Sequence, residues 1–234
     1  MRRFARWAVG LLVALLLLAA SAALAGLWLL RGSLPQLDGR VAAGEGGPGA
    51  GVVIERDAAG APTLRGESLA DVAYGLGFLH AQDRFFQMDL SRRFAAGELA
   101  ALLGPRMVEQ DRKARVFRFR QVARRVVADA TPAQRAVFEA YARGVNRGLD
   151  ALRSRPWEYI LLRSTPQPWR AEDSVLAVHA MWWELQHEEV NREIARRSIT
   201  ARVGERVADA SHAGEVTAFL FPRGDEWEIG RAHV

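Results

Sequence analysis

The sequence predicts an α+β protein that is mainly helical and that follows an N-terminal signal or transmembrane helix. Three observations support this prediction. An apolar run of membrane-spanning length opens the chain, one short stretch of β-branched residues follows, and most of the remainder repeats apolar residues at helical spacing. With 234 residues, half of them apolar, the chain is long enough to bury a core of its own.

Residues 1–30 are typical of a signal peptide or a membrane anchor. Three arginines among the first six residues precede an apolar stretch from Trp7 to Leu30, which is the order found in export signals. The stretch is long enough to span a bilayer. Ala23-Leu24-Ala25 offers a cleavage site, yet apolar residues continue beyond it, so a cleaved signal and a retained anchor both stay open. Either outcome predicts the periplasm or the extracellular face, with a retained helix anchored in the inner membrane.

A linker and a β-hairpin are expected next. Residues 31–50 are rich in glycine and proline and predict a linker without regular structure. Gly51–Asp57 is rich in β-branched residues and predicts a strand. Gly60 supplies the positive φ that a tight turn needs, and residues 61–65 form a second extended segment.

Helices are expected through the rest of the chain. Ser68 and Asp71 form a helix start signal, with the acid in the first turn. Residues 112–129 predict one amphipathic helix, and Thr131-Pro132 begins another. The last predicted helix begins near Asp173 and ends near Arg202. It is apolar nearly all round from Val175 to Leu185, so this part is expected to be buried.

Charge and cysteine content exclude several classes of function. The formal net charge is +5, and of the 32 basic residues only Lys113 is a lysine. The arginines are scattered among acidic residues without a basic run, which argues against a nucleic-acid partner. Because the chain has no cysteine, disulfides, zinc thiolate sites and a cysteine nucleophile are excluded.

Charged side chains crowd into the otherwise apolar segment 71–93. They are Asp83, Arg84, Asp89, Arg92 and Arg93, and the polar Gln87 lies among them. Asp89 precedes Arg92 and Arg93 by three and four residues, the spacing at which helical side chains pair. Asp83 falls on the apolar face, where a carboxylate without a partner is too costly. A satisfied internal hydrogen-bond network is therefore predicted around this segment.

The same segment resembles the penicillin acylase family, also called penicillin amidases, which are N-terminal nucleophile hydrolases. The resemblance extends from about Ser33 to Arg197. The most specific match is Gly77-Phe78-x-His80-Ala81-Gln82-Asp83-Arg84-x-x-Gln87-Met88, followed by Arg92-Arg93, Gly97-Glu98-Leu99 and Gly104. The other residues that resemble the family are Ser33-Leu34-Pro35 with Leu37-Asp38-Gly39, the segment Ile54–Pro62, Tyr141-Ala142-x-Gly144-Val145-Asn146, and Pro166-x-Pro168-Trp169 with Asp173-Ser174. The chain departs from the family pattern at Ala61 and Leu64.

The resemblance implies an αββα precursor that is activated by autoproteolysis. Such a precursor contains a signal, an α-region, a spacer and a β-region that begins with serine. The hydroxyl of this serine attacks a linear amide (C–N) bond, its own α-amine acts as the base, and backbone and amide donors stabilise the oxyanion. No serine of this chain is followed by asparagine, as the family's nucleophile is. We therefore expect residues 51–227 to be an incomplete α-region that is inactive by itself, residues 228–234 to be a non-native tail, and the nucleophile to lie in a missing β-region. No catalytic residue is assigned.

The resemblance further implies two site roles for the long helix. Met181 and Leu185 match positions that line the acyl pocket, although core packing is the alternative for both. Glu193 matches a Ca²⁺ ligand, and Glu188 and Glu189 are rival ligands. One carboxylate cannot form a calcium site alone, because calcium takes several oxygen ligands, so the others would come from the β-region. Pairing with a nearby arginine is the alternative for Glu193.

Two classes of function remain open at this point. The first is the α-region of an exported acylase, with the β-region of the same precursor as its partner. Its substrate would be a small-molecule amide, such as a β-lactam side-chain amide or an N-acyl homoserine lactone. The second is a non-catalytic envelope protein, or a basic binding module, anchored to the membrane through the N-terminal helix. A β-region downstream in the same gene would favour the first.

Overall fold

The computed structural model describes residues 2–42, 44 and 46–203. The chain divides into two compact units, Met1–Met181 and Trp182–Val234. The described residues are mainly helical, as predicted, and their one sheet has two strands. The predicted tail at 228–234 lies outside the described residues.

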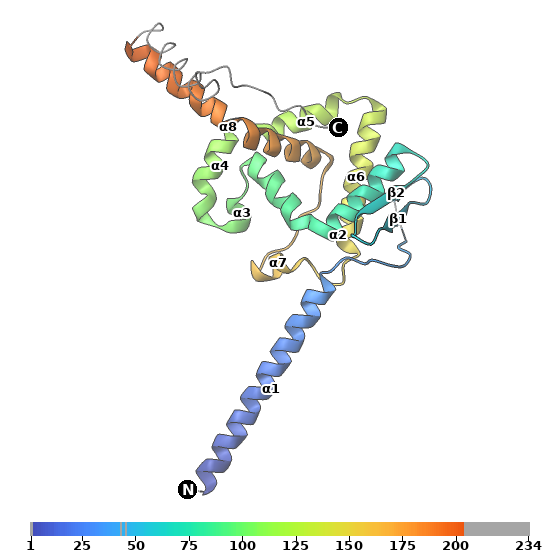
Figure 1. Cartoon of the computed structure of the whole chain (residues 1–234), viewed down its shortest axis with the longest axis vertical. Helices are drawn as coiled ribbons and strands as arrows, with labels where there is room; N and C mark the ends of the chain where they lie inside the picture. Colours follow the sequence, from blue (N-terminus) through green and yellow to red (C-terminus); the bar gives the residue numbers. More distant parts are fainter. Residues whose placement is uncertain (1, 43, 45, 204–234) are drawn as a thin grey trace, which may run out of the picture. The chain divides into compact units, whose positions relative to one another are not determined.

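The N-terminal apolar segment forms one helix, α1 (Arg2–Gly32), drawn in blue in Figure 1. Its window Gly10–Gly32 is 23 residues long and apolar enough to cross a membrane, and nearly all of it is exposed, with Gly32 at its end buried. A signal sequence has the same properties, so a cleaved signal and a retained anchor both fit. The linker that follows has no helix or strand among the described residues 33–42, 44 and 46–50.

The predicted hairpin is present. Strand β1 (Val53–Arg56) pairs antiparallel with β2 (Pro62–Arg65), so that Val53 lies opposite Arg65. The carboxylate of Asp57 accepts hydrogen bonds from the backbone N–H groups of Ala59 and Ala61, at 2.9 and 2.8 Å. Gly60 has a φ of +80°, as the turn requires.

Helix α2 (Leu69–Ala96) begins with a capping box that also holds the linker. The Ser68 hydroxyl accepts from the backbone N–H of Asp71 at 3.1 Å, and the Asp71 carboxylate accepts from the backbone N–H of Ser68 at 3.2 Å. The backbone N–H of Gly49 donates to the same carboxylate at 2.6 Å. Asp71 therefore satisfies orphan donors of two segments that are distant in sequence.

The Asp71 cap predicts an acid-sensitive contribution to stability. The hydrogen bond from the Ser68 hydroxyl, together with the backbone donors, lowers the pKa of Asp71 below 3.8 although burial opposes them. Because the pKa is lower in the folded state, the stabilisation is complete above pH 3.8 and is lost as the pH falls toward the folded-state value. Asp71→Asn should lower the thermal midpoint at pH 6 and reduce the difference between pH 6 and pH 3. Equal pH dependence of the two proteins would contradict this.

Residues 112–129 form two helices, so the prediction of one helix there was wrong. α3 (Ala100–Leu103) and the 3₁₀ turn η1 (Pro105–Met107) come first, and then α4 (Val108–Arg115) and α5 (Phe119–Asp129). Arg118 breaks the helix with a φ of +52°. No glycine or proline marks this break, and the rings of Phe117 and Phe119 stack across it with centroids 5.3 Å apart. Tertiary packing therefore overrides local propensity here.

Helix α6 (Pro132–Asp150) starts at the predicted Thr131-Pro132 cap and packs along α2. Glycines form the contact. A Cβ atom added to Gly77, Gly144 or Gly148 would overlap a backbone carbonyl of the opposite helix. Close backbone approach, rather than interlocking of large side chains, therefore holds the α2–α6 pair.

The hydrophobic core lies against this helix pair and includes the short helix α7 (Trp157–Leu161). Its largest members are Phe85 of α2, Tyr159 of α7 and Trp169, and each is at most 3% exposed. Phe85 contacts both other rings, with centroids 6.1 and 6.4 Å apart. The core thus joins the middle of α2 to the segment that leads into the last helix.

Helix α8 (Ala171–Val203) has nearly the predicted bounds. The prediction that its apolar part is buried all round was wrong, because burial is confined to one face. Val175, Leu176 and Ala180 are buried. An apolar stripe on the same helix is exposed, and it consists of Val178, Met181, Trp182 and Leu185.

Candidate functional site

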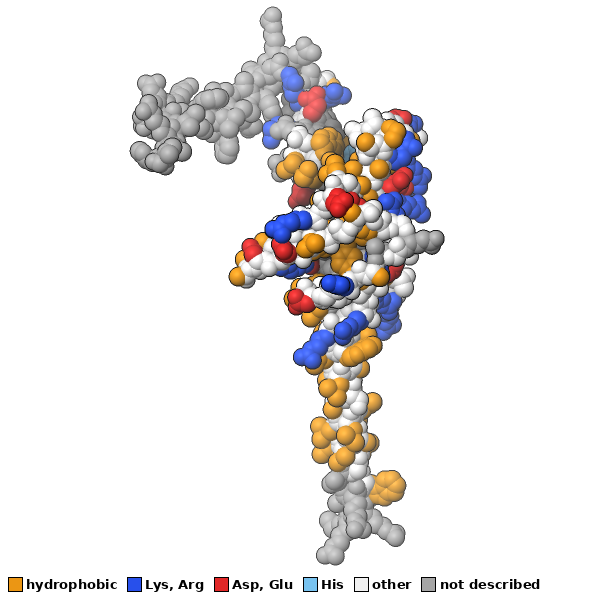
Figure 2. All heavy atoms as spheres, turned by 90° about the vertical axis from the view of Figure 1, so that its right-hand side faces the viewer, with side chains coloured by type: hydrophobic (Ala, Val, Ile, Leu, Met, Phe, Trp, Pro, Cys, Tyr) orange, Lys and Arg blue, Asp and Glu red, His pale blue; other side chains and the backbone are white. Residues whose placement is uncertain are grey.

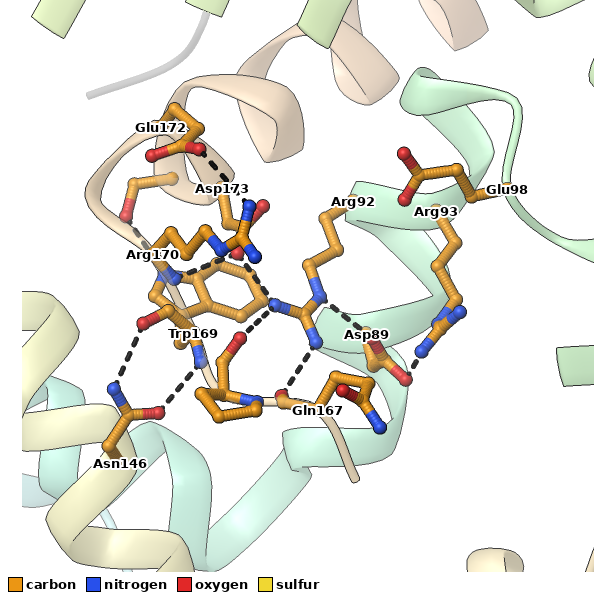
Figure 3. A network of polar contacts seen from close by, with 12 residues as sticks. Asp89, Arg92, Arg93, Glu98, Asn146, Gln167, Trp169, Arg170, Glu172 and Asp173 are labelled. Carbon is orange, nitrogen blue, oxygen red and sulfur yellow. Dashed lines mark hydrogen bonds and ion pairs between the residues drawn. The ribbon is translucent and has the colours of Figure 1, made fainter. Parts of the chain in front are cut away.

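A buried ionic network links α2 to the start of α8 (Figure 3). Asp89 is fully buried, and one of its oxygens accepts a hydrogen bond from Arg92 Nε at 2.7 Å. The other oxygen accepts from Arg93 Nε at 2.9 Å and from the Tyr159 hydroxyl at 2.6 Å. Burial, and next the hydrogen bond to Asp89, raise the pKa of Tyr159, so the phenol keeps its proton and donates.

Arg92 connects this cluster to the segment before α8. Its Nη1 donates to Asp173 Oδ2 at 2.6 Å and to the Pro168 carbonyl at 2.8 Å, and its Nη2 donates to the Gln167 carbonyl at 2.8 Å. The guanidinium also lies 4.9 Å from the ring centroid of Trp169. A planar fork of donors suits this arrangement, and a lysine could not reproduce it.

Asp173 extends the network to Arg120 and, through it, to Glu98. It accepts from Arg120 Nη1 at 3.0 Å and from the backbone N–H of Arg170 at 2.8 Å, as well as from Arg92. Arg120 in turn donates to both oxygens of Glu98 at 2.7 Å. Among the described residues, every buried side-chain nitrogen and oxygen has a hydrogen-bond partner. A network this fully satisfied holds α8 in register and offers no free group for reaction.

The internal network was predicted, but only three of the six predicted side chains belong to it. Asp89, Arg92 and Arg93 do. Asp83 is at the surface, with its side chain 21% exposed, and pairs with Arg56 of β1 at 2.7 and 2.9 Å. Arg84 and Gln87 are exposed.

A kink explains why the predicted position of Asp83 was wrong. Arg84 has non-helical dihedrals, φ −154° and ψ 34°, inside α2. The helical phase changes there, so residues before and after Arg84 do not share one face as an unbroken helix would require. Of the other members of the network, Tyr159, Asp173 and Arg120 come from distant segments and Glu98 follows the end of α2, and helical spacing alone could not have found them.

His80 has a structural environment. Its Nδ1 is 2.9 Å from the hydroxyl of Tyr141 on α6, and the two rings meet edge to face. Burial, and then the positive charge of Arg84, lower the pKa of His80. Burial raises the pKa of Tyr141 to about 12. Both groups are thus neutral near pH 7, and their contact links α2 to α6.

The predicted pocket residues lie on the exposed side of α8. Met181 is 56% exposed and Leu185 is 69% exposed, so neither packs into the core formed by the described residues. They are four residues apart and therefore on one helix face, together with Val178. An apolar surface of this kind could contact an acyl group or a second polypeptide.

The predicted calcium ligand is paired with arginines. Glu193 accepts from Arg197 Nε at 2.9 Å and lies 3.8 Å from Arg196 Nη1, with its side chain 48% exposed. Within the described part of the chain, no three histidine, aspartate or glutamate side chains lie together as metal ligands would. The side chains of the rivals Glu188 and Glu189 lie outside the described residues. Exposed ion pairs of this kind are weak.

One cavity of about 560 Å³ lies elsewhere in the first unit. The linker residues 36–41, strand β1 and helix α2 surround it, and neither Met181 nor Leu185 lines it. Its polar groups include Asp38, Arg56 and Arg147. Arg56 and Arg147 already donate to neighbours, to Asp83 and to the Ala42 carbonyl respectively.

Comparison with known proteins agrees with the fold and the motifs. The model of the family described as penicillin amidase matches residues 51–232. Penicillin acylase 2 proenzyme of Pseudomonas sp. (strain SE83) is 35% identical over 163 residues, covering 67% of this chain and 21% of that protein. Acyl-homoserine lactone acylase QuiP of Pseudomonas putida is 34% identical over 154 residues, covering 65% of this chain and 19% of that protein. The chain therefore spans about a fifth of the length of these relatives.

A solved structure is similar over most of the chain. Thermostable penicillin G acylase from Alcaligenes faecalis superposes with a TM-score of 0.57 at 27% identity. The match covers 79% of this chain and 97% of that chain. Taken with the family match over residues 51–232, these similarities show that the chain belongs to the penicillin amidase family.

Proposed function

We propose that this chain is the α-region of an exported acylase that hydrolyses linear amide bonds. The observation that supports the proposal most strongly is the match to 97% of a chain of penicillin G acylase, together with the family match over 51–232. The nucleophile would be the N-terminal serine of a β-region outside this chain, activated by its own α-amine. By itself this chain would be inactive, and it would act in the periplasm or on the outer face of the inner membrane.

The role of this chain would be to position α8 for the β-region. The Asp89–Arg92–Asp173 network fixes the start of α8 against α2. The exposed stripe, Val178, Met181, Trp182 and Leu185, then presents large apolar side chains that are 43–69% exposed. Burial of such a stripe stabilises association, at roughly 25 cal/mol for each Å² of apolar surface removed from water. The β-region of the same precursor is the proposed partner that buries part of it.

Met181 and Leu185 would contact the acyl group of a small-molecule amide at the edge of that interface. Their side chains are apolar, exposed and on one face of α8. The polar part of the substrate would face the serine of the β-region. β-Lactam side-chain amides and N-acyl homoserine lactones both offer the required acyl–amide group.

Calcium is proposed as a structural ion at the interface, with Glu193 as the ligand from this chain. Its carboxylate is half exposed and forms surface ion pairs with Arg196 and Arg197. The remaining oxygen ligands would have to come from the β-region, because calcium takes six to eight of them. If so, Glu193→Gln should weaken the retention of calcium by the assembled enzyme.

Coexpression with the β-region tests the proposed activity. We expect a complex of the two chains that hydrolyses acyl amides, and we expect neither chain to do so alone. The control replaces the first serine of the β-region by alanine, which should leave the complex intact and abolish hydrolysis. A stable complex without activity on either substrate class, or a gene without a β-region, would reject the proposal.

Truncation of the proposed pocket residues gives a sharper prediction. In the assembled enzyme, Met181→Ala and Leu185→Ala should each lower kcat/KM about tenfold for amides with long acyl groups, because a few lost methylene contacts are worth about 1–3 kcal/mol. Amides with an acetyl group should be much less affected, since they do not reach the truncated side chains. Val116→Ala is the matched control, because Val116 is 76% exposed and lies far from α8 in sequence. Equal losses for long and short acyl groups would show that the two residues act on assembly instead.

A further inference from the structure

Two hydrogen bonds join the C-terminal end of α1 to the loop that follows α6. The backbone N–H of Ser154 donates to the Gly32 carbonyl at 3.0 Å, and the Ser154 hydroxyl donates to the Leu29 carbonyl at 2.7 Å. Gly32 permits this contact, because an added Cβ atom would lie 2.8 Å from Ser154 Oγ. The Gly32 carbonyl, which has no partner within the helix, thereby gains a donor, and the Leu29 carbonyl accepts a second hydrogen bond beside the one from the Ser33 N–H, so α1 joins the rest of the unit at a defined point.

Helix α7 begins three residues after this junction and presents apolar side chains to solvent. Trp157 is 48% exposed and Leu161 is 73% exposed, and their spacing places them on one helix face. The opposite face is held in the core, because Tyr159 is fully buried and its hydroxyl donates to Asp89 at 2.6 Å. Helix α7 therefore cannot rotate to bury Trp157 and Leu161 without breaking the ionic network.

More exposed apolar and basic side chains accompany this junction. Leu34 and Leu37, just after α1, are 62% and 66% exposed. The exposed arginines of this region are Arg31, Arg40, Arg153, Arg155 and Arg163, against the three acids Asp38, Asp150 and Glu158. Figure 2 shows basic side chains near the C-terminal end of α1, whose described part is covered with hydrophobic side chains. Tryptophan, leucine and arginine in combination are typical of segments that lie at a membrane surface.

The length of α1 fits this arrangement. Trp7 and Trp28 are 81% and 69% exposed and 21 positions apart, which is about 31 Å along a helix. This matches the roughly 30 Å thickness of the hydrocarbon core, and tryptophan prefers its two boundaries. Trp28 at the outer boundary would bring Leu29, and with it the bonded Ser154, to the headgroup level.

We propose that α7 docks on the outer surface of the bilayer that α1 spans. Trp157 and Leu161 insert at the headgroup boundary beside the anchor, and the neighbouring arginines face lipid phosphates. The occupant of this apolar surface is thus the phospholipid bilayer itself. The membrane would hold the folded unit at two points and restrict its rotation about α1. This inference requires α1 to be retained, and it does not depend on the proposed acylase activity.

Single-cysteine labelling tests the docking, and the absence of native cysteine makes each label unique. The full chain, reconstituted in nanodiscs, would carry a fluorophore at Leu161→Cys, at Leu18→Cys within α1, or at Val116→Cys as an exposed control. Lipids with a doxyl quencher near the headgroup should quench the label at 161 several-fold more than the label at 116. Quenchers in the middle of the acyl chain should act most strongly on the label at 18. Adding Trp157→Ser to Leu161→Cys should reduce the quenching at 161.

Three outcomes would overturn the proposal. The label at 161 could be as accessible to water and as weakly quenched as the label at 116. It could be shielded from water without being quenched by doxyl lipid, which would mean that protein covers the site. The label at 18 could escape quenching, which would mean that α1 does not hold the chain in the bilayer.

Discussion

Gly144→Ala should destabilise the chain by about 3 kcal/mol, although alanine is the better helix former by about 1 kcal/mol. Gly144 lies within α6, and a Cβ atom there would overlap the backbone carbonyl of Tyr74 on α2. A carbonyl of a packed helix cannot rotate away as a flexible side chain can, so the two helices must separate. For a unit of this size the thermal midpoint should fall by about 6–12 °C, measured by circular dichroism on the full chain in detergent.

Gly51→Ala is the matched control for this prediction. An added Cβ atom at Gly51 meets nothing within 4 Å. Loss of glycine there should leave stability unchanged or raise it slightly, because it restricts the unfolded chain. Gly77→Ala should behave like Gly144→Ala, since its Cβ atom would overlap the carbonyl of Tyr141. A midpoint for Gly144→Ala equal to that of Gly51→Ala would mean that α2 and α6 do not approach so closely.

Arg92→Met should cost about 3–5 kcal/mol, the usual loss when one partner of a buried ion pair is removed. Methionine retains much of the volume of the side chain but none of the donors. Asp89 and Asp173 would each lose a charged partner while remaining buried, and the carbonyls of Gln167 and Pro168 would lose their donor. Urea unfolding followed by tryptophan fluorescence measures the change.

Two further variants separate the reasons for this loss. Arg92→Lys keeps the charge but cannot donate in four directions, so it should also be clearly destabilising. Arg112→Ala removes the pair of Arg112 with Glu109, whose side chains are 72% and 75% exposed, and should cost less than about 1 kcal/mol. If Arg92→Met were as mild as Arg112→Ala, the buried network would contribute specificity rather than stability.

Local signals in the sequence were sufficient for the element boundaries that depend on caps and turns. The Ser68–Asp71 cap, the Thr131-Pro132 cap and the turn at Gly60 all formed where expected, because each uses side chains within four residues of the backbone group that they satisfy. The break at Arg118 was missed for the corresponding reason. It has no local signal, and the two helices that it separates, α4 and α5, both contact α2.

In the candidate site, too, contacts between residues close in sequence could be predicted and contacts between distant residues could not. Helical spacing correctly paired Asp89 with Arg92 and Arg93, since these residues are one turn apart. It misplaced Asp83, because the kink at Arg84 shifts the helical phase. It could not indicate that Tyr159 and Asp173 complete the network, because they lie 70 and 81 residues beyond the residues that they contact.

By itself, the sequence determined the family, the apolar N-terminal helix and the mainly helical class, because ordered motifs, hydrophobic length and periodicity are properties of the chain as written. Only the tertiary structure decided which faces are covered. It showed that Gly77 and Gly144 are required because a Cβ atom at either position would overlap a backbone carbonyl of the opposite helix. It also showed that Met181 and Leu185 are exposed on α8. The physical reason is that burial depends on contacts between distant segments, and periodicity identifies an apolar face without naming the surface that covers it.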